Sequence, residues 1–467
     1  MSEEEKKLLN KKKETIELEE EDKYYKEKKQ KYIIEGISSL ISCIIHTFGY
    51  FSIWTLSNSV VYLISFRRHY NPNLTFSHGY FLFPIMNLAL SLTAPIGGII
   101  EDKIGGKKTI FLSTLILCSG FSFMYFSRNI YIDYILMGLN GLGIAIGINI
   151  TKKNACSFFM NNKALICGVI NLIPGFFCAW LNIFNEKHIL NPLSEKPSIE
   201  NIFYDKNIFL NFQRLIIFEI ALLIFTCLVT LVLYFENDPK ETIKFGFHEK
   251  EVENKNIKKE KNQNQKQLRV KKAIYNSRAI KLFFMIFCFL PTINFINNTW
   301  RPIGIYYNIN TYYLQLTGTL YSLIGCISSI VFSLIGDKIT FRILFVLFSF
   351  IITIVSFIFP LSFNNEIFFI SGILAISFIL SGFNIIIDPH IMKIYGMENY
   401  IEIGGVIRSS GGICEIFSVI FAFCLENNFS GNKNYIYKFM YIISGCFSMI
   451  SLLFGLFEND DKFNYDS

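Results

Sequence analysis

Twelve apolar runs, each about 20 residues long, follow one another along the chain with short polar segments between them. A helix of that length crosses the hydrocarbon core of a bilayer, which is roughly 30 Å thick. Composition agrees, since 52% of the 467 residues are hydrophobic and only 17% are charged. Leu, Ile, Phe and Gly fill the runs without strict alternation, which favours helices over the strands of an outer-membrane barrel. The sequence therefore predicts an all-α integral membrane protein.

The predicted membrane spans cover twelve stretches of the chain: residues 33–64, 78–100, 109–127, 130–151, 164–184, 212–235, 281–306, 313–335, 341–361, 366–388, 402–425 and 435–457.

A basic segment, residues 236–280, divides these spans six and six, and its core "NKNIKKEKNQNQKQ" is of low complexity. The positive-inside rule places this segment in the cytoplasm, and an even number of helices then places both termini there. The expected organisation is a charged, disordered tail over 1–32, an N-terminal six-helix bundle over 33–235, a cytoplasmic linker over 236–280, a C-terminal six-helix bundle over 281–457 and a short tail over 458–467. The membrane is predicted to be the plasma membrane or that of an organelle.

The first thirty residues are mostly Lys and Glu and contain no apolar core, which excludes a cleavable signal peptide. Within them, Glu4 followed by Leu8 and Leu9 fits an acidic dileucine pattern, so a sorting adaptor is one predicted partner. A solvated tail without that role is the plainer interpretation.

The two halves of the chain repeat each other at a nearly constant spacing. "IEDKI" at 100–104 pairs with "IGDKI" at 335–339, 235 positions later, and "GVI" at 168–170 pairs with "GVI" at 405–407, 237 positions later. The resulting residue pairs are Asp102 with Asp337, Lys103 with Lys338, Lys107 with Arg342, Asn149 with Asn384, Gly168 with Gly405 and Asn171 with Arg408. Two parallel repeats of six helices predict two pseudo-symmetric bundles that rock about a site near the bilayer midplane.

The stretch "GGIIEDKIGGKK", Gly97 to Lys108, joins the second and third runs and packs four glycines, two acids and three lysines into one turn. Glycine allows the chain to turn sharply. An Asp beside a helix N-terminus can accept hydrogen bonds from its orphan amides, and the lysines hold the turn in the cytoplasm.

This turn resembles the loop signature G-x-x-x-D-[RK]-x-G-[RK]-[RK] of the major facilitator superfamily. The matching residues are Gly98, Asp102, Lys103, Gly105, Lys107 and Lys108, with Gly106 as one extra residue, and "SLIGDKITFR" resembles the degenerate second copy through Asp337 and Lys338. The resemblance implies twelve transmembrane helices and a turn that latches the two halves in one conformational state. Met137 stands where the family often carries an Arg that partners the Asp of the turn.

Within that superfamily, "ACSFFMNNKALICGVINLIPGFF" resembles the approach to the fifth helix in monocarboxylate transporters and oxalate-formate antiporters, with Lys163 in place of an Arg. The resemblance implies a small carboxylate as solute. Those families use an Arg in the eighth helix to hold it, and the run 313–335 contains no basic residue.

Ionisable residues inside membrane spans are candidates for function because they are costly in hydrocarbon. Arg408 and Glu415 in "GGVIRSSGGICEIF" are seven positions apart, so they fall on one face of a helix. Arg408 can bind a carboxylate bidentately or pair with Asp388. Glu415 can carry a proton or hold an amine.

Further candidates are Asn171, the repeat mate of Arg408, and His46, which can titrate between about pH 5 and 8 or act as a structural hydrogen-bond donor. Asp388 precedes Pro389 at the predicted inner end of its helix, which favours a capping or gate role. Glu219 lies near the predicted outer end of its helix, where a carboxylate can reach the interface.

The leading functional hypothesis is a secondary active transporter that moves a small polar or anionic solute, with a monocarboxylate favoured, by alternating access. No nucleotide-binding loop, metal-ligand spacing or catalytic constellation occurs, so no cofactor, no metal, no nucleic-acid partner and no enzyme activity are predicted. Proton coupling, an amino acid or sugar as solute, and a non-transporting scaffold or receptor of the same fold remain open alternatives.

Overall fold

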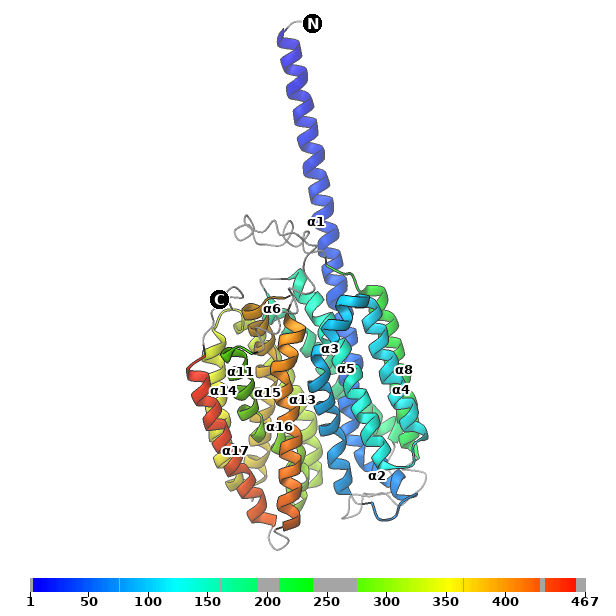
Figure 1. The fold of residues 1–467 in the computed structure, drawn as a ribbon, viewed down its shortest axis with the longest axis vertical. Helices are drawn as coiled ribbons and strands as arrows, with labels where there is room; N and C mark the ends of the chain where they lie inside the picture. The colour runs from blue at the N-terminus through cyan, green and yellow to red at the C-terminus, as the bar shows by residue number, and fades with distance from the viewer. Residues whose placement is uncertain are drawn as a thin grey trace.

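The computed structural model describes residues 3–74, 76–159, 162–190, 210–237, 275–363, 365–397, 399–428 and 433–458. Nearly all of them are helical, and the elements fall into two bundles (Figure 1). The N-terminal bundle comprises α1 (Glu3–Thr55), α2 (Val60–Arg68), α3 (Leu82–Ile104), α4 (Gly106–Phe126), α5 (Ile130–Phe158), α6 (Lys163–Phe184) and α8 (Asn211–Leu233). The C-terminal bundle comprises α11 (Ser277–Phe289), α12 (Pro291–Tyr306), α13 (Thr311–Ile335), α14 (Phe341–Ile358), α15 (Glu366–Tyr395), α16 (Tyr400–Asn428) and α17 (Lys433–Leu456).

Twelve helical stretches among the described residues are long and apolar enough to cross a membrane. The predicted all-α class with twelve spanning helices is therefore confirmed, and the protein is a multi-pass membrane protein. The seventh span is broken, because Pro291 cannot continue the backbone ladder of α11 and begins α12 instead.

Most predicted spans differ from the observed ones at one end or both, and three of these differences bear on how the charged residues are packed. The first spanning stretch is Lys23–Thr55 instead of 33–64, since the chain turns through η1 (Leu56–Ser59) into the short α2. The fourth and tenth continue to Phe158 and Tyr395, beyond the predicted ends at 151 and 388. In both cases the predicted span ends at or next to a charged residue. The helix continues past that residue, whose side chain lies in the protein interior beside a residue of opposite charge.

The predicted disordered tail over 1–32 is wrong for residues 3–32, which are helical and continue directly into the first span. Lys and Glu are good helix formers, and pairs four positions apart add to this, as Lys31 and Glu35 do at 3.8 Å. Figure 1 shows this part of α1 projecting beyond the bundle. The side chains of Leu8 and Leu9, and residues 238–274 of the predicted linker, lie outside the part of the chain that the structure describes.

Two apolar cores organise the molecule. One lies wholly in the N-terminal bundle. Its residues, such as Met86, Phe121 and Leu215, come from the same half of the length of the helices. The other fills the C-terminal bundle and crosses into the N-terminal bundle through residues such as Ile150 and Ile166. The two bundles thus share a core at one end only.

We call this shared end the charged end, because it holds Glu101, Lys152, Lys153, Asp388 and Arg408. Two helix pairs join the bundles along their length, α3 with α16 and α6 with α13. We call them the α3–α16 seam and the α6–α13 seam.

Candidate functional site

A buried cluster of three charges links the two bundles at the charged end. Lys152 Nζ on α5 pairs with Asp388 Oδ2 on α15, and Arg408 on α16 pairs with Asp388 Oδ1. The Asp388 side chain is 4% exposed, against 13% for Lys152 and 25% for Arg408. Two cations from different bundles therefore share one buried acid, an arrangement that is strongly destabilised when the acid is lost.

Both terminal nitrogens of Arg408 also donate to other protein groups. Its Nη1 donates to Asn149 Oδ1 on α5 at 3.0 Å, and its Nη2 donates to Tyr400 Oη at 2.7 Å. The guanidinium carbon lies 5.3 Å from the centroid of the Tyr400 ring, a cation–π distance. In this conformation the predicted substrate residue Arg408 joins the bundles, and the pairing with Asp388 that the sequence left open is the one observed.

The positions of these charges follow from the long helices α5 and α15. Lys152 lies inside α5, and the adjacent Lys153 donates to Glu101 Oε2 of α3 at 2.9 Å. Pro389 lies inside α15, so the expectation that Asp388 sits at the end of its helix is wrong. Each charge is tolerated within its helix because an opposite charge from another helix neutralises it.

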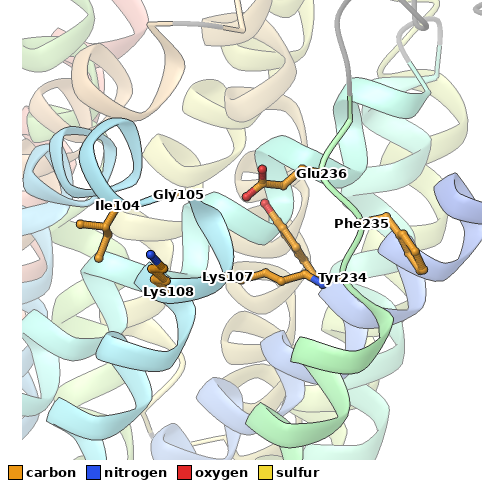
Figure 2. Close-up of a pocket in the computed structure, with 7 residues that line it drawn as sticks. All are labelled: Ile104, Gly105, Lys107, Lys108, Tyr234, Phe235 and Glu236. Atoms are coloured by element: carbon orange, nitrogen blue, oxygen red, sulfur yellow. The ribbon is translucent and has the colours of Figure 1, made fainter.

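The turn between α3 and α4 contains glycine, and a residue far along the sequence caps the start of α4. Gly105 has φ of 84°, a conformation that favours glycine, and it separates the two helices. The amide of Gly106 donates to Glu236 Oε1 at 3.0 Å, which satisfies an orphan donor at the start of α4. Figure 2 shows Glu236 and Tyr234 beside this turn in a hollow of about 380 Å³ that also contains Lys107 and Lys108.

The predicted gating residues of the turn differ in their surroundings. Asp102, Lys103 and Lys107 are exposed. Gly98 faces α16 closely, and a Cβ there would lie 2.9 Å from Glu402 Cδ. Met137, at the position of the absent Arg, is a buried member of the N-terminal core.

The second copy of the turn shows the expected capping interaction. Asp337 Oδ1 accepts from the amide of Ala164 at 3.0 Å, and Oδ2 accepts from that of Leu165 at 3.2 Å. Both amides belong to the first turn of α6 in the opposite bundle, where an anion is favoured. Its neighbour Lys338 is exposed.

The repeat mates Gly168 and Gly405 occupy equivalent places on the two seams. A Cβ on Gly405 would lie 2.7 Å from the backbone nitrogen of Pro95 on α3. A Cβ on Gly168 would lie 2.1 Å from Ser333 Cβ on α13. The internal repeat read from the sequence therefore corresponds to two points of close approach between the bundles.

Farther along α16, Glu415 contacts the N-terminal bundle through a different partner. Asn87 Nδ2 on α3 donates to its two carboxylate oxygens at 3.1 and 2.9 Å. The preceding Cys414 accepts from Asn294 Nδ2 at 3.6 Å, one turn from Asn297, whose Oδ1 accepts from Tyr321 Oη at 2.9 Å. These contacts form a polar seam across α3, α16, α12 and α13, and Arg408 belongs to a separate group.

The other two predicted binding residues lie apart from Glu415. His46 on α1 is buried, its Nδ1 is 3.2 Å from Thr151 Oγ1, and its ring centroid is 4.3 Å from that of Tyr50. Thr151 precedes Lys152 in the sequence, so His46 lies near the charged cluster. Asn171 is half-buried on α6.

Sequence reasoning missed several polar residues that the fold buries. Arg67, expected in a loop, is completely buried, with Nε 2.6 Å from Asp133 Oδ2 and Nη2 donating to the carbonyl of Met124 at 2.8 Å. Glu219 was expected to reach an interface, and it is instead completely buried. The only available signal was opposite charge at corresponding helix ends, as for Arg67 and Asp133. No grouping of His, Cys, Asp and Glu suited to a metal ion occurs among the described residues.

The comparisons with known proteins agree with this architecture. The sequence profile of the Major Facilitator Superfamily matches residues 209–419, from the start of the sixth span to most of the eleventh. Solved structures of that superfamily superpose along nearly the whole chain. The chain has the major facilitator fold.

Three structures illustrate the match to this superfamily. A proton:xylose symporter is 12% identical, with a TM-score of 0.60 over 91% of this chain and 94% of its own. The E. coli fucose:proton symporter is 11% identical, with a TM-score of 0.62 over 91% and 98%. The human organic anion transporter TETRAN is 8% identical, with a TM-score of 0.64 over 91% and 99%. Among curated protein sequences, no relative matches.

Proposed function

We propose that this protein is a secondary active transporter that moves a small polar solute by alternating access. The observation that carries the proposal is the uneven junction between the bundles. They share an apolar core and the Lys152–Asp388–Arg408 cluster at the charged end, while the core in the other half of the N-terminal bundle is separate. A carrier held closed at one end requires such a junction, and it must be able to break.

In this proposal the charged end faces the cytoplasm. The exposed Lys103, Lys107 and Lys338 lie there, and the basic residues of the linker support the same side. Both chain termini are then cytoplasmic. The turn around Asp102 and its copy around Asp337 are proposed to change their contacts when the cluster opens.

The polar seam around Glu415 is the proposed solute contact. Asn87 and Glu415 come from opposite bundles, so a solute bound between them would be held by both halves and would sense their movement. Asn294, Asn297 and Tyr321 add amide and hydroxyl groups on the same route. This set contains amide and hydroxyl groups and one acid, Glu415. It suits a hydroxylated or amine-bearing solute, such as a sugar or an amino acid.

A monocarboxylate is the second candidate, and Arg408 favours it. Arg408 has the fork that binds a carboxylate, but in this conformation its Nη2 pairs with Asp388 and its Nη1 donates to Asn149. A carboxylate solute would therefore compete with Asp388 and could itself trigger opening of the charged end. Asn171, the repeat mate of Arg408, lies on α6 of the opposite bundle, and in this proposal it is a further solute-binding candidate.

The experiment is uptake into proteoliposomes with a reversible lock on the charged end. In the double variant Gly98→Cys with Glu402→Cys, the new thiol at 402 replaces a Cγ atom that lies 3.2 Å from the Cβ position of residue 98, which is close to disulfide geometry. Uptake of sugars, amino acids and monocarboxylates is measured with and without a pH gradient, before oxidation, after it and after reduction.

Carrier function predicts uptake of at least one solute that stops on oxidation and returns on reduction. The single variants Gly98→Cys and Glu402→Cys are the controls, and oxidation should leave their uptake unchanged. Uptake that continues in the cross-linked protein would contradict alternating access. No uptake of any solute class would favour the scaffold alternative.

A further inference from the structure

A second buried carboxylate, Glu219, lies inside the N-terminal bundle. It is on α8, and none of its side chain reaches the surface. Ser52 on α1 is its hydrogen-bond partner, and the other oxygen, Oε1, has no hydrogen-bond partner among the described residues. A carboxylate buried with a single hydroxyl partner is unfavourable in its ionised form.

The hydroxyl of Ser52 lies between two acceptors at the same distance. Its Oγ is 2.8 Å from Glu219 Oε2 and 2.8 Å from the carbonyl oxygen of Gly49. A hydroxyl has one hydrogen, so it can donate to one of them. If Glu219 is ionised, the other contact brings two oxygen atoms together with no hydrogen between them.

A proton on Glu219 removes this conflict. The acid then donates from Oε2 to Ser52 Oγ, and Ser52 donates to the carbonyl of Gly49. Both 2.8 Å contacts become hydrogen bonds, and Oε1 is left as a neutral carbonyl oxygen. The geometry therefore fits a carboxylic acid better than a carboxylate.

The elements around α8 supply no counter-ion. Among the described residues, no Lys, Arg or His is within ion-pair distance of Glu219, and its only hydrogen-bond partner is Ser52. The other ionisable groups near the bundle interior on these elements are His46, which contacts Thr151, Tyr50, which contacts Ser113, Arg67, which pairs with Asp133, and the thiols of Cys43 beside Thr47, Cys118 on α4 and Cys227, buried on α8 itself. His188 on η3 (Asn185–Leu190) and Arg214 on α8 are exposed.

We propose that Glu219 is a proton-binding site and supplies the coupling proton for the transport proposed above, on which this assignment of its role rests. The acid holds its proton while α1 and α8 are packed as observed. When α1 moves and water reaches the site, the O–H bond breaks, the proton passes to water and the carboxylate remains. Glu415 provides the contrast, because an amide that donates to both of its oxygens fits an ionised carboxylate.

Infrared spectroscopy of the purified protein tests the protonation directly. At neutral pH the wild-type protein should show the C=O band of a protonated carboxyl group, and the band should be lost in Glu219→Gln. The matched variant Glu415→Gln should keep it. In Ser52→Ala the band should remain and shift to higher frequency, because the acid loses its hydrogen bond. A band that persists in Glu219→Gln would overturn the proposal.

Transport measurements then test the role of that proton. In Glu219→Gln, pH-driven accumulation should fall to the equilibrium ratio while solute counterflow continues. Accumulation at the wild-type level would overturn the coupling role. If the wild-type protein transports none of the solutes, the proposed function fails, yet the infrared result still decides whether Glu219 is protonated.

Discussion

The α3–α16 seam and the α6–α13 seam are related by the internal repeat, and they join the bundles by different means. Both rely on a close approach at a glycine, Gly405 in one and Gly168 in the other. Beside the first lie the Lys152–Asp388–Arg408 cluster and the Asn87–Glu415 contact. The second has the exposed cap from Asp337 and a thiol contact from Cys326 to the carbonyl of Leu172 at 3.7 Å.

The two seams therefore have the same close contact at a glycine, while buried charges lie beside the first. Small residues let two helices approach in lipid on both seams. Buried charges on the α3–α16 side can be opened by a competing ion or proton, whereas apolar and backbone contacts cannot. We therefore expect the α3–α16 side to control opening and the α6–α13 side to act as the more constant contact.

The largest effect is expected from Asp388→Asn, because it leaves Lys152 and Arg408 half-buried without their anion. Breaking a buried pair in this way costs about 3–5 kcal/mol. Thermal unfolding in detergent should show a marked loss of stability or a transition to an open form. Lys152→Gln is the matched control, since it leaves a neutral Arg408–Asp388 pair. Equal effects of the two variants would contradict the shared-acid interpretation.

A smaller effect is expected from adding one methyl group to each glycine contact. Gly168→Ala places a Cβ against Ser333, and overpacking of this kind costs about 1–3 kcal/mol. Ser333→Gly should recover most of that loss. Gly405→Ala meets the backbone nitrogen of Pro95, so Pro95→Ala should not recover it. Thermal unfolding of the four single and two double variants measures this, and rescue on both seams would refute the difference between them.

Asp337→Asn should have a weaker effect again. The variant keeps a hydrogen-bond acceptor for the amides of Ala164 and Leu165 but loses the charge that favours a helix N-terminus, worth about 0.3–1 kcal/mol. The loss should shrink as salt is raised, because the site is exposed. A thermal shift that does not depend on salt would argue against this electrostatic origin.

The smallest effect on the contact between the bundles is expected from a substitution of Glu458. This residue pairs with Lys281 at 3.1 Å and with Arg278 at 3.3 Å, both within the C-terminal bundle. Burial alone would raise the pKa of Glu458, but the nearby His390 and Lys281 outweigh it and lower the pKa below its usual value.

Its contribution to stability is therefore full above the ordinary pKa of a glutamate, about 4.3, and is lost as pH falls through the lowered value. Glu458→Gln should flatten the acid limb of thermal stability against pH without opening the charged end. An acid limb that is unchanged in this variant would remove Glu458 from the account.

The fold could be predicted because the lengths of the apolar runs and the spacing of the repeat can be read from the sequence without knowing which side chains meet. The twelve spans, the glycine turn at Gly105 and the capping by an aspartate, seen at Asp337, depend on local pattern. The charged cluster depends on which side chains meet, and α5 is separated from α15 and α16 by about two hundred residues of chain. Lys152 lies one residue beyond the predicted end of the fourth span, and only tertiary packing makes it a partner of Asp388. Glu219 was misread for the same reason, because its depth depends on the neighbouring α1 and not on its position along α8.

The most direct test of the account measures the distance between the bundles at the charged end. Spin labels at Lys107→Cys and Arg342→Cys, exposed repeat mates on opposite bundles, report this distance by pulsed electron resonance once the exposed Cys424 and Cys446 are replaced by Ser. The account predicts one dominant short distance in the labelled wild-type background and a longer population in Asp388→Asn, with no such population in Asp337→Asn. Identical distributions in the wild-type background and in Asp388→Asn would contradict a junction at the charged end that is held by this cluster.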